Sequence, residues 1–349
     1  DDLTKAVENA SKDINIYAAR GSSLIELKEY EKSIPDFNKA IEGGLKDTDL
    51  FFKRGTAKYM LKDYSGAFPD LDQAITSGTA RAVAFDMRGY CRYESKKLDE
   101  AIRDFNMAIE TDPKLAVAFF HRGDARFTAN NLPEAIQDYT QAVTLGLDDP
   151  ILYNNRGKAH FKQENYASAI ADYNRAIDRR KDYTRAYDNR GQAYFITKKY
   201  EEAIKDFREV EKLTEKPDPE LFRWLGNSYY NLEKFPPARD YYDKLINAGI
   251  KDKEVFFKRG LMRLEEEDYE GALQDLENAE KAGENTVSLH LNRGRAYIAL
   301  DDTKSAVAAL NKALDIDPKN VDAHFNRALV KEGLEDYEGA MLDYNKVIQ

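Results

Sequence analysis

An Arg-Gly pair returns every 34 residues along this chain of 349 residues, and that fixed period constrains the fold more than any other feature. In its regular part, the pair occurs at Arg20-Gly21, Arg54-Gly55, Arg88-Gly89, Arg122-Gly123, Arg156-Gly157 and Arg190-Gly191. After a one-residue slip it returns at Arg259-Gly260 and Arg293-Gly294, and two copies are altered, to Leu225-Gly226 and Arg327-Ala328. A repeat of roughly 20 to 50 residues cannot bury its own apolar face and must stack on its neighbours. The period therefore predicts a solenoid.

Each repeat carries the apolar pattern of two helices. When the recurring glycine is placed at position 8, position 4 is usually aromatic, position 20 small, position 24 large and position 27 mostly alanine. The spacing of positions 20, 24 and 27 marks one face of a helix. Polar turns such as Lys62-Asp63 separate this helix from the one before it. Small residues at positions 8 and 20 let the two backbones approach closely, so the pattern predicts an all-α chain of helix pairs.

These positions resemble the tetratricopeptide repeat, a helix-turn-helix unit with the same aromatic, glycine and alanine positions. The resemblance covers essentially the whole chain and implies a right-handed superhelical solenoid of antiparallel helix pairs. We expect residues 1–13 to be the second helix of a truncated preceding repeat, and residues 14–349 to form one solenoid domain of ten repeats, the last incomplete. The expected starts lie near residues 14, 48, 82, 116, 150, 184, 219, 253, 287 and 321.

Two features of this array are irregular. One extra residue beside Pro217 and Pro219 predicts an irregular junction near 213–220, with a local change of superhelical pitch. In addition, neither end of the sequence shows the polar outer face that terminal repeats need. We therefore expect a fragment of a larger protein, in which oligomerisation through the uncapped ends is a further possibility.

The arginine at position 7 is matched by an aspartate at position 23. Both charges vanish together in the seventh repeat, as Leu225 and Tyr241, while Arg293 faces Ala309 in the ninth. This joint loss favours an ion pair within the repeat that holds its two helices together, and not a ligand contact. The predicted structural pairs are Arg20 with Asp36, Arg54 with Asp70, Arg88 with Asp104, Arg122 with Asp138, Arg156 with Asp172, Arg190 with Asp206, Arg259 with Asp275 and Arg327 with Asp343.

Composition and motifs narrow the function classes. A formal charge of -10 argues against a general nucleic-acid binder, and the longest apolar runs are too short to span a bilayer, so no direct membrane insertion is expected. Four scattered histidines and the single Cys91 give no metal-ligand spacing. No nucleophile-base or phosphate-loop signature appears. We expect no catalytic residue, no metal and no cofactor, and a cytoplasmic location is slightly preferred to export or membrane anchoring through missing termini.

The resemblance implies that the first helices line a concave groove through positions 2, 5, 6, 9, 12 and 13. Repeats five to seven are rich there in amides and basic groups, which favour an acidic or polar extended peptide. Trp224, the only tryptophan, is the best single candidate for a binding hot spot. The candidate groove residues are Asn154, Asn155, Lys158, Lys162, Arg185, Asn189, Gln192, Arg223, Trp224, Asn227, Asn231, Asn292 and Asn326.

Two functions follow from these observations. The first is a noncatalytic scaffold that binds partner proteins or extended peptide segments in its groove. The alternative is the targeting or substrate-recruiting arm of an enzyme or of a transport or secretion machine whose active domain lies outside this sequence. Recognition of chaperone tails is not expected, because no repeat has the lysine at position 5 that the family's carboxylate clamp uses.

Overall fold

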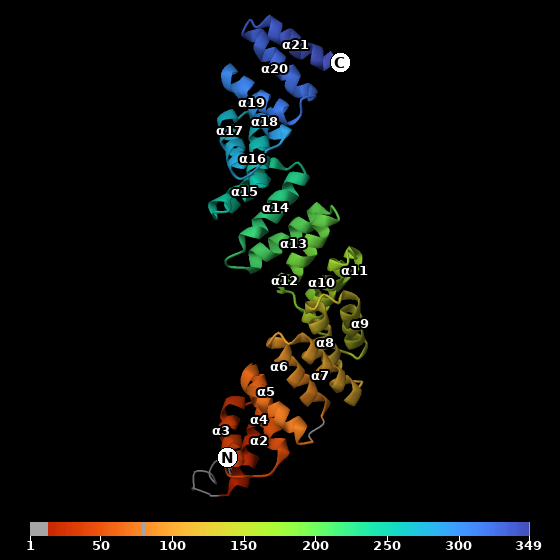
Figure 1. Ribbon diagram of the computed structural model, residues 1–349. Helices are drawn as coiled ribbons and strands as arrows, with labels where there is room; N and C mark the ends of the chain where they lie inside the picture. Colours follow the sequence, from red (N-terminus) through yellow and green to blue (C-terminus); the bar gives the residue numbers. More distant parts are fainter. Residues whose placement is uncertain (1–12, 79–80, 349) are drawn as a thin grey trace. The chain divides into compact units, whose positions relative to one another are not determined.

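Helix pairs make up most of the part of the chain that the structure describes. The computed structural model describes residues 13–78 and 81–348, and within them it contains twenty α-helices of 12 to 14 residues and no strand (Figure 1). The predicted all-α fold of paired helices is therefore confirmed. The predicted helix of a preceding repeat, in residues 1–13, lies outside the described residues except for Asp13, which caps the first described helix.

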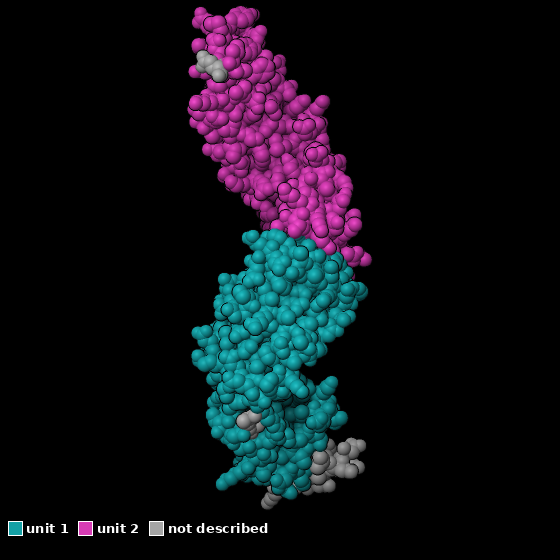
Figure 2. Space-filling model, turned by 90° about the vertical axis from the view of Figure 1, so that its right-hand side faces the viewer, with its two compact units in different colours: residues 1–193 teal, residues 194–349 magenta. Residues whose placement is uncertain are grey.

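Contacts divide the chain into two compact units, residues 1–193 and 194–349 (Figure 2). The helices that begin in the first unit are α2 (Ile14–Glu26), α3 (Tyr30–Glu42), α4 (Thr48–Met60), α5 (Tyr64–Thr76), α6 (Ala82–Glu94), α7 (Leu98–Thr111), α8 (Ala116–Thr128), α9 (Leu132–Thr144), α10 (Pro150–Lys162), α11 (Tyr166–Arg179) and α12 (Thr184–Ile196). The second unit contains α13 (Tyr200–Leu213), α14 (Pro219–Asn231), α15 (Phe235–Asn247), α16 (Lys253–Glu265), α17 (Tyr269–Lys281), α18 (Val287–Ala299), α19 (Thr303–Ile316), α20 (Val321–Gly333) and α21 (Tyr337–Ile348). A single solenoid domain stays a prediction.

The turns within repeats and the turns between repeats have different backbone conformations. The residue that follows each first helix and its C-cap has a left-handed φ of 56 to 63°, although it is never glycine, as at Lys62 and Glu164. Between repeats, glycines such as Gly44 and Gly146 supply the left-handed residue after a second helix of 13 residues. Where that glycine is missing, the second helix has 14 residues and the chain leaves it extended, as at Asp112. A glycine just past a helix end is the common terminator because it lacks the Cβ clash.

The extra residue of the seventh repeat lies in the link before α14. Helix α13 has 14 residues, yet residues 214–218 add a link one residue longer than the link 112–115, which also follows a 14-residue helix. Asp218 then caps α14 by accepting a hydrogen bond from the Glu220 amide, and Pro219 occupies the first turn, where its missing N–H is not needed. The predicted change of pitch at this junction stays a prediction.

The core of each repeat forms where position 8 of the first helix meets position 24 of the second. Tyr139, Tyr173 and Phe105 are buried at position 24 against the bare backbone of the glycine in their own repeat. Alanines at positions 20 and 27 complete the same face, and Ala169 and Ala176 are fully buried examples. None of the described helices has both the length and the apolar character needed to cross a membrane.

Candidate functional site

A repeated ion pair ties the first helix of a repeat to its second helix. The position-7 guanidinium donates from Nε and Nη2 to the two carboxylate oxygens of position 23, at 2.5 to 3.0 Å. This two-bond form is the strongest geometry of an arginine-carboxylate pair. It joins Arg20 to Asp36, Arg54 to Asp70, Arg88 to Asp104, Arg122 to Asp138, Arg156 to Asp172, Arg259 to Asp275 and Arg327 to Asp343.

The aspartates at position 23 are all buried, including Asp36, Asp70, Asp138 and Asp206, at 0 to 4% exposed. A carboxylate enclosed between two helices is not available to a ligand from solution, which fits the predicted structural role of these residues and does not fit a binding site. Asp206 is buried like the others, and its predicted partner Arg190 belongs to the other compact unit. The pairing of Arg190 with Asp206 therefore stays a prediction.

The same guanidinium also reaches the preceding repeat, a contact that the sequence reasoning missed. In seven repeats its Nη1 donates to position 25 of the second helix one repeat earlier, so that the arginine also contacts the preceding repeat. In the third repeat, for example, Arg88 binds Asp104 of its own repeat and Asp72 of the repeat before. The acceptors are Asn38, Asp72, Asn106, Thr140, Asn174, Asp243 and Asn311. The recurring short polar residue at position 25 was the available signal.

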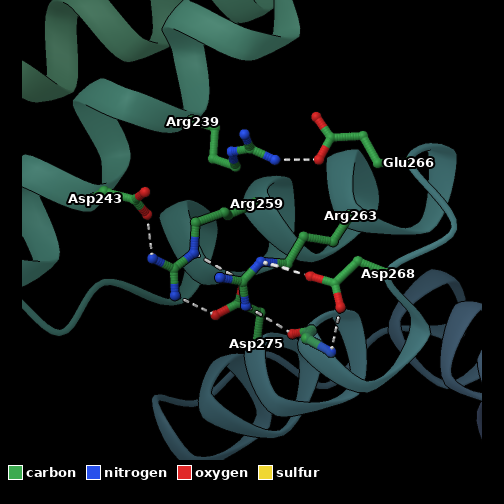
Figure 3. A network of polar contacts seen from close by, with 8 residues as sticks. Arg239, Asp243, Arg259, Arg263, Glu266, Asp268 and Asp275 are labelled. Carbon is green, nitrogen blue, oxygen red and sulfur yellow. Dashed lines mark hydrogen bonds and ion pairs between the residues drawn. The ribbon is translucent and has the colours of Figure 1, made fainter.

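Position 11 supplies a second cation to the same aspartate in five repeats. Figure 3 shows the eighth repeat, in which Arg259 and Arg263 both contact Asp275 and Arg259 extends to Asp243. The corresponding cations elsewhere are Lys58, Arg92, Arg126 and Lys331. Burial raises the pKa of Asp343, but hydrogen bonds from Arg327, Lys331 and His324 outweigh it and hold the pKa well below its usual range.

Two repeats depart from this arrangement. In the seventh, the Tyr241 ring stacks on Tyr229 at 5.8 Å between centroids, and its hydroxyl donates to Glu211 at 2.9 Å, so an aromatic cluster replaces the ion pair. In the ninth, Arg293 donates to Glu280 of the preceding repeat, while Ala309 is buried. In both repeats the substitute contacts again join neighbouring helices.

The predicted groove amides of repeats five and six form hydrogen bonds with other side chains of the array. Asn155 donates to Asp124 of the preceding repeat at 2.9 Å, and Asn189 donates to Asn154 at 2.8 Å. Asn154 itself is buried, and Gln192 donates to Asp188 at 3.0 Å. The first two of these bonds join successive first helices of the first compact unit. The amides therefore contribute to repeat stacking as well as to the polar surface.

The predicted groove residues of the second compact unit are also engaged. Arg223 forms ion pairs with Glu220 and Asp252, at 2.8 and 2.6 Å. Trp224 packs its ring against Phe195 and Phe207, with centroids 5.1 and 6.0 Å away. Asn227 accepts from Tyr242 and Lys258, and three further amides donate to the carbonyl four residues earlier in their own helix: Asn231, Asn292 and Asn326.

Two lysines on α10 differ from Arg223 because neither forms an ion pair with another described residue. The Lys158 and Lys162 ammonium groups lie over the Phe127 ring, 5.4 and 4.8 Å from its centroid, and both side chains are exposed. Among the described residues neither has an ion-pair partner. Arg185, at the start of α12, is exposed as well. This part of the first helices is therefore locally positive on an acidic chain.

A pocket of about 210 Å³ lies beside these lysines, between α10, α11 and α12. It is lined by Lys158, Phe161, Lys162, Tyr173, Asn189 and Gln192, all within the first compact unit. A second pocket, of about 330 Å³, lies between α2, α4 and the start of α6, where Lys53 and Arg81 both pair with Asp49. Of these two pockets, the first alone has lysines free of an ion-pair partner among the described residues.

The remaining residues of types that often act in catalysis or bind metal ions have surroundings typical of a structural role. Cys91 is 1% exposed, and burial raises the pKa of its thiol to about 12, as expected for a packed thiol and not for a nucleophile. Within the described ranges, no three His, Cys, Asp or Glu side chains gather as a metal ion would require. Two histidines lie beside a carboxylate: His121 Nδ1 is 2.9 Å from Asp86 Oδ1 on the preceding repeat, and His324 Nδ1 is 2.8 Å from Asp343 Oδ1 in its own repeat.

The His121 contact predicts a pH-dependent contribution to stability. Burial lowers the pKa of His121, but the charge and hydrogen bond of Asp86, together with the charge of Asp124, outweigh it, so the folded pKa is raised. The contribution is therefore fully present below the unfolded pKa of about 6.5 and is lost as pH rises through the folded value. Urea unfolding of wild type and His121→Gln should show a stability difference that shrinks from pH 5.5 to pH 9, roughly the range over which histidine titrates.

The comparison with His121→Gln controls for the other histidines. Burial lowers the pKa of His160 and His290, so their protonation opposes folding as pH falls, but both are present in the two proteins and cancel in the difference. A stability difference that stays constant or grows with pH would contradict the role of the His121 and Asp86 pair.

Comparisons with known proteins agree with this geometry. Two models described as tetratricopeptide repeat match residues 154–220 and 14–42, and a model described as TPR repeat matches residues 123–164 and 294–334. Within the curated proteins, none matches the chain. PilW, a type IV pilus biogenesis factor, is similar in structure with a TM-score of 0.50 and 17% identity, over 57% of this chain and 91% of its own.

Two further solved structures are similar over part of the chain. YrrB, described as a TPR protein with an unusual peptide-binding site, is 24% identical with a TM-score of 0.48, over 53% of this chain and 95% of its own. A tetratricopeptide repeat protein from Parabacteroides merdae is 18% identical with a TM-score of 0.48, over 74% of this chain and 98% of its own. At these identities the likeness concerns the fold.

Proposed function

Because the chain belongs to the tetratricopeptide repeat family, we propose that it is a noncatalytic scaffold that holds extended segments of partner proteins along its first helices. Polar side chains recur at repeat spacing on rigid helices, an arrangement suited to binding an extended chain at several points. A catalytic site needs a few groups that converge on one reacting atom. Cys91, His121 and Asp343, whose pKa values are perturbed, lie in three different repeats.

We place the binding surface at repeats five and six and propose an acidic segment as the ligand. The observation that carries this assignment is the pair of exposed lysines, Lys158 and Lys162, whose ammonium groups have no ion-pair partner among the described residues. Arg223 of the seventh repeat is a weaker candidate, because Glu220 and Asp252 already neutralise it. An acidic chain that carries a local positive surface attracts ligands of opposite charge in a way that salt screens.

A peptide selection tests this proposal. A library of random peptides selected on immobilised protein of residues 1–349 should become enriched in Asp and Glu, and binding of the selected peptides should weaken as salt is raised. The double substitution Lys158→Glu and Lys162→Glu should abolish that binding, because it reverses both free charges. Cross-linking mass spectrometry should place the bound peptides on α10 and α12.

Matched charge reversals provide the control. Lys62→Glu and Lys114→Glu change the net charge of the chain by the same amount at exposed lysines outside the candidate groove. They should leave peptide binding nearly unchanged. Enrichment of neutral or basic peptides, or equal loss of binding in both double variants, would argue against a specific acidic-peptide surface at repeats five and six.

A further inference from the structure

The Tyr173 hydroxyl is an unused donor in a buried position. Tyr173 is 1% exposed and lines the pocket between α10, α11 and α12, yet its hydroxyl makes no hydrogen bond within the described residues. The hydroxyl oxygen is not fully enclosed, so the small exposed area of Tyr173 includes this atom. Buried polar groups are rarely left without a partner, because an unmade hydrogen bond costs free energy.

Comparison with the same position in other repeats explains why the donor is free. The position-24 tyrosines of repeats four and seven donate to position 9 of their own repeat: Tyr139 to Asp124 at 2.7 Å, and Tyr242 to Asn227 at 2.8 Å. In repeat five, position 9 is Lys158, which has no acceptor atom. Replacement of the acceptor by a cation thus leaves the Tyr173 hydroxyl without its partner, and Tyr173, Lys158 and Lys162 line the same pocket.

The residues around the pocket are suited to a hydrogen-bond acceptor that is carried on a short apolar side chain. Burial, followed by the charges of Asp172 and Asp188, raises the pKa of Tyr173, so the hydroxyl stays protonated and can donate. The carboxylates nearby are already engaged: Asp172 pairs with Arg156, Asp188 accepts from Gln192, and Asp124 accepts from Tyr139 and Asn155. The ring of Phe161 provides an apolar wall for methylene groups. Hydrogen bonds from cations to a carboxylate are stronger than those between neutral groups.

The size of the pocket limits the ligand to one side chain. At about 210 Å³ it is smaller than the roughly 300 to 1,000 Å³ typical of small-molecule sites. We propose that this pocket is a subsite for a glutamate side chain of the bound peptide, with the carboxylate accepting from Tyr173, Lys158 and Lys162 and the methylenes on Phe161. The inference rests on the proposed peptide-binding function and specifies which residue the surface selects.

The test measures the binding of labelled peptides to wild type and to a variant that lacks the Tyr173 hydroxyl. End-blocked fluorescent peptides of glycine and serine would carry Glu, Asp, Gln or phosphoserine at the same positions, and fluorescence anisotropy would measure their binding to the full chain. The Glu peptide should bind most tightly. Tyr173→Phe should weaken it by about tenfold, the effect of one hydrogen bond to a charged group. The same variant should keep the wild-type Tm, since the hydroxyl has no partner among the described residues.

Tyr139→Phe is the matched control, because it removes the same atom from the same position one repeat earlier. Its hydroxyl donates to the half-buried Asp124, so this variant should lower Tm and leave affinity for the Glu peptide nearly unchanged. If wild type binds none of the acidic peptides, the proposed function fails and the subsite with it. If wild type and Tyr173→Phe bind the Glu peptide equally, only the subsite is wrong. Tighter binding of the phosphoserine or Asp peptide would overturn the assignment to glutamate.

Discussion

Asp275→Ala is expected to destabilise the α16 and α17 pair by about 3 to 5 kcal/mol, the usual effect of removing one partner from a buried ion pair. Asp275 is 0% exposed and accepts two hydrogen bonds from Arg259, at 2.8 and 2.5 Å, and a third contact from Arg263 at 3.0 Å. The substitution leaves both guanidinium groups between helices without their shared counter-charge. Urea unfolding gives the total change, and hydrogen exchange should show the largest loss of protection in α16 and α17.

Asp243→Ala is the control that distinguishes the loss of a buried partner of Arg259 from the loss of a charge alone. Asp243 accepts from the same Arg259 at 2.5 Å, but its side chain is 42% exposed. Exposed ion pairs contribute about 0 to 1 kcal/mol, so this variant should change stability little. Equal losses of stability at positions 243 and 275 would mean that burial of the aspartate does not determine how much the ion pair stabilises the fold.

Gly226→Ala is expected to destabilise the seventh repeat by about 1 to 3 kcal/mol, the range for overpacking a filled core. A Cβ at this position would lie 2.5 Å from Cε1 and 2.6 Å from Cδ1 of Tyr242, which is fully buried. The ring has little freedom to move, because its hydroxyl is bonded to Asn227. Alanine also raises helix propensity by about 0.5 to 1 kcal/mol, and the steric clash should exceed that gain. Thermal unfolding measures the difference.

Two other glycines make a graded series with Gly226. At Gly260 the nearest atom to a new Cβ would be in the Leu276 side chain, at 3.1 Å, and a leucine can adjust, so Gly260→Ala should be close to neutral. At Gly333, inside α20, no atom lies within 4 Å, so alanine should stabilise by up to about 1 kcal/mol through helix propensity. An increase in Tm for Gly226→Ala would show that helix contact does not require glycine at position 8.

The helix pairs could be predicted from the sequence because a repeat array shows the same packing pattern many times. One occurrence of a small residue opposite an aromatic carries little information, but Gly123 against Tyr139 and Gly157 against Tyr173 recur at one spacing. The pairing of positions 7 and 23 followed from their joint loss at Leu225 and Tyr241. A charge that disappears with its partner identifies the pair, because leaving either one alone and buried is costly.

The contacts between repeats were less predictable. Where position 25 accepts from a guanidinium it is asparagine, aspartate or threonine. Asparagine and threonine carry no charge that would mark them as partners, so the short polar pattern was only a weak signal for Asn38 with Arg54 and Thr140 with Arg156. The groove amides were a similar case. Their sequence pattern indicates hydrogen bonding, but the direction of the Asn189 side chain toward Asn154 depends on how two first helices lie beside each other.

By itself, the sequence determined the repeat, the helix pairs and the residues whose small size lets the helices touch, because these follow from a period of 34 residues and from side-chain size. Only the tertiary structure decided which polar groups remain free. Hydrogen-bond satisfaction depends on atoms from two or three helices at once. Lys158 and Arg223 carry the same charge in the sequence, but Arg223 forms ion pairs with two carboxylates and Lys158 forms none among the described residues. Tyr139 and Tyr173 occupy the same position, but only Tyr139 has an acceptor opposite its hydroxyl.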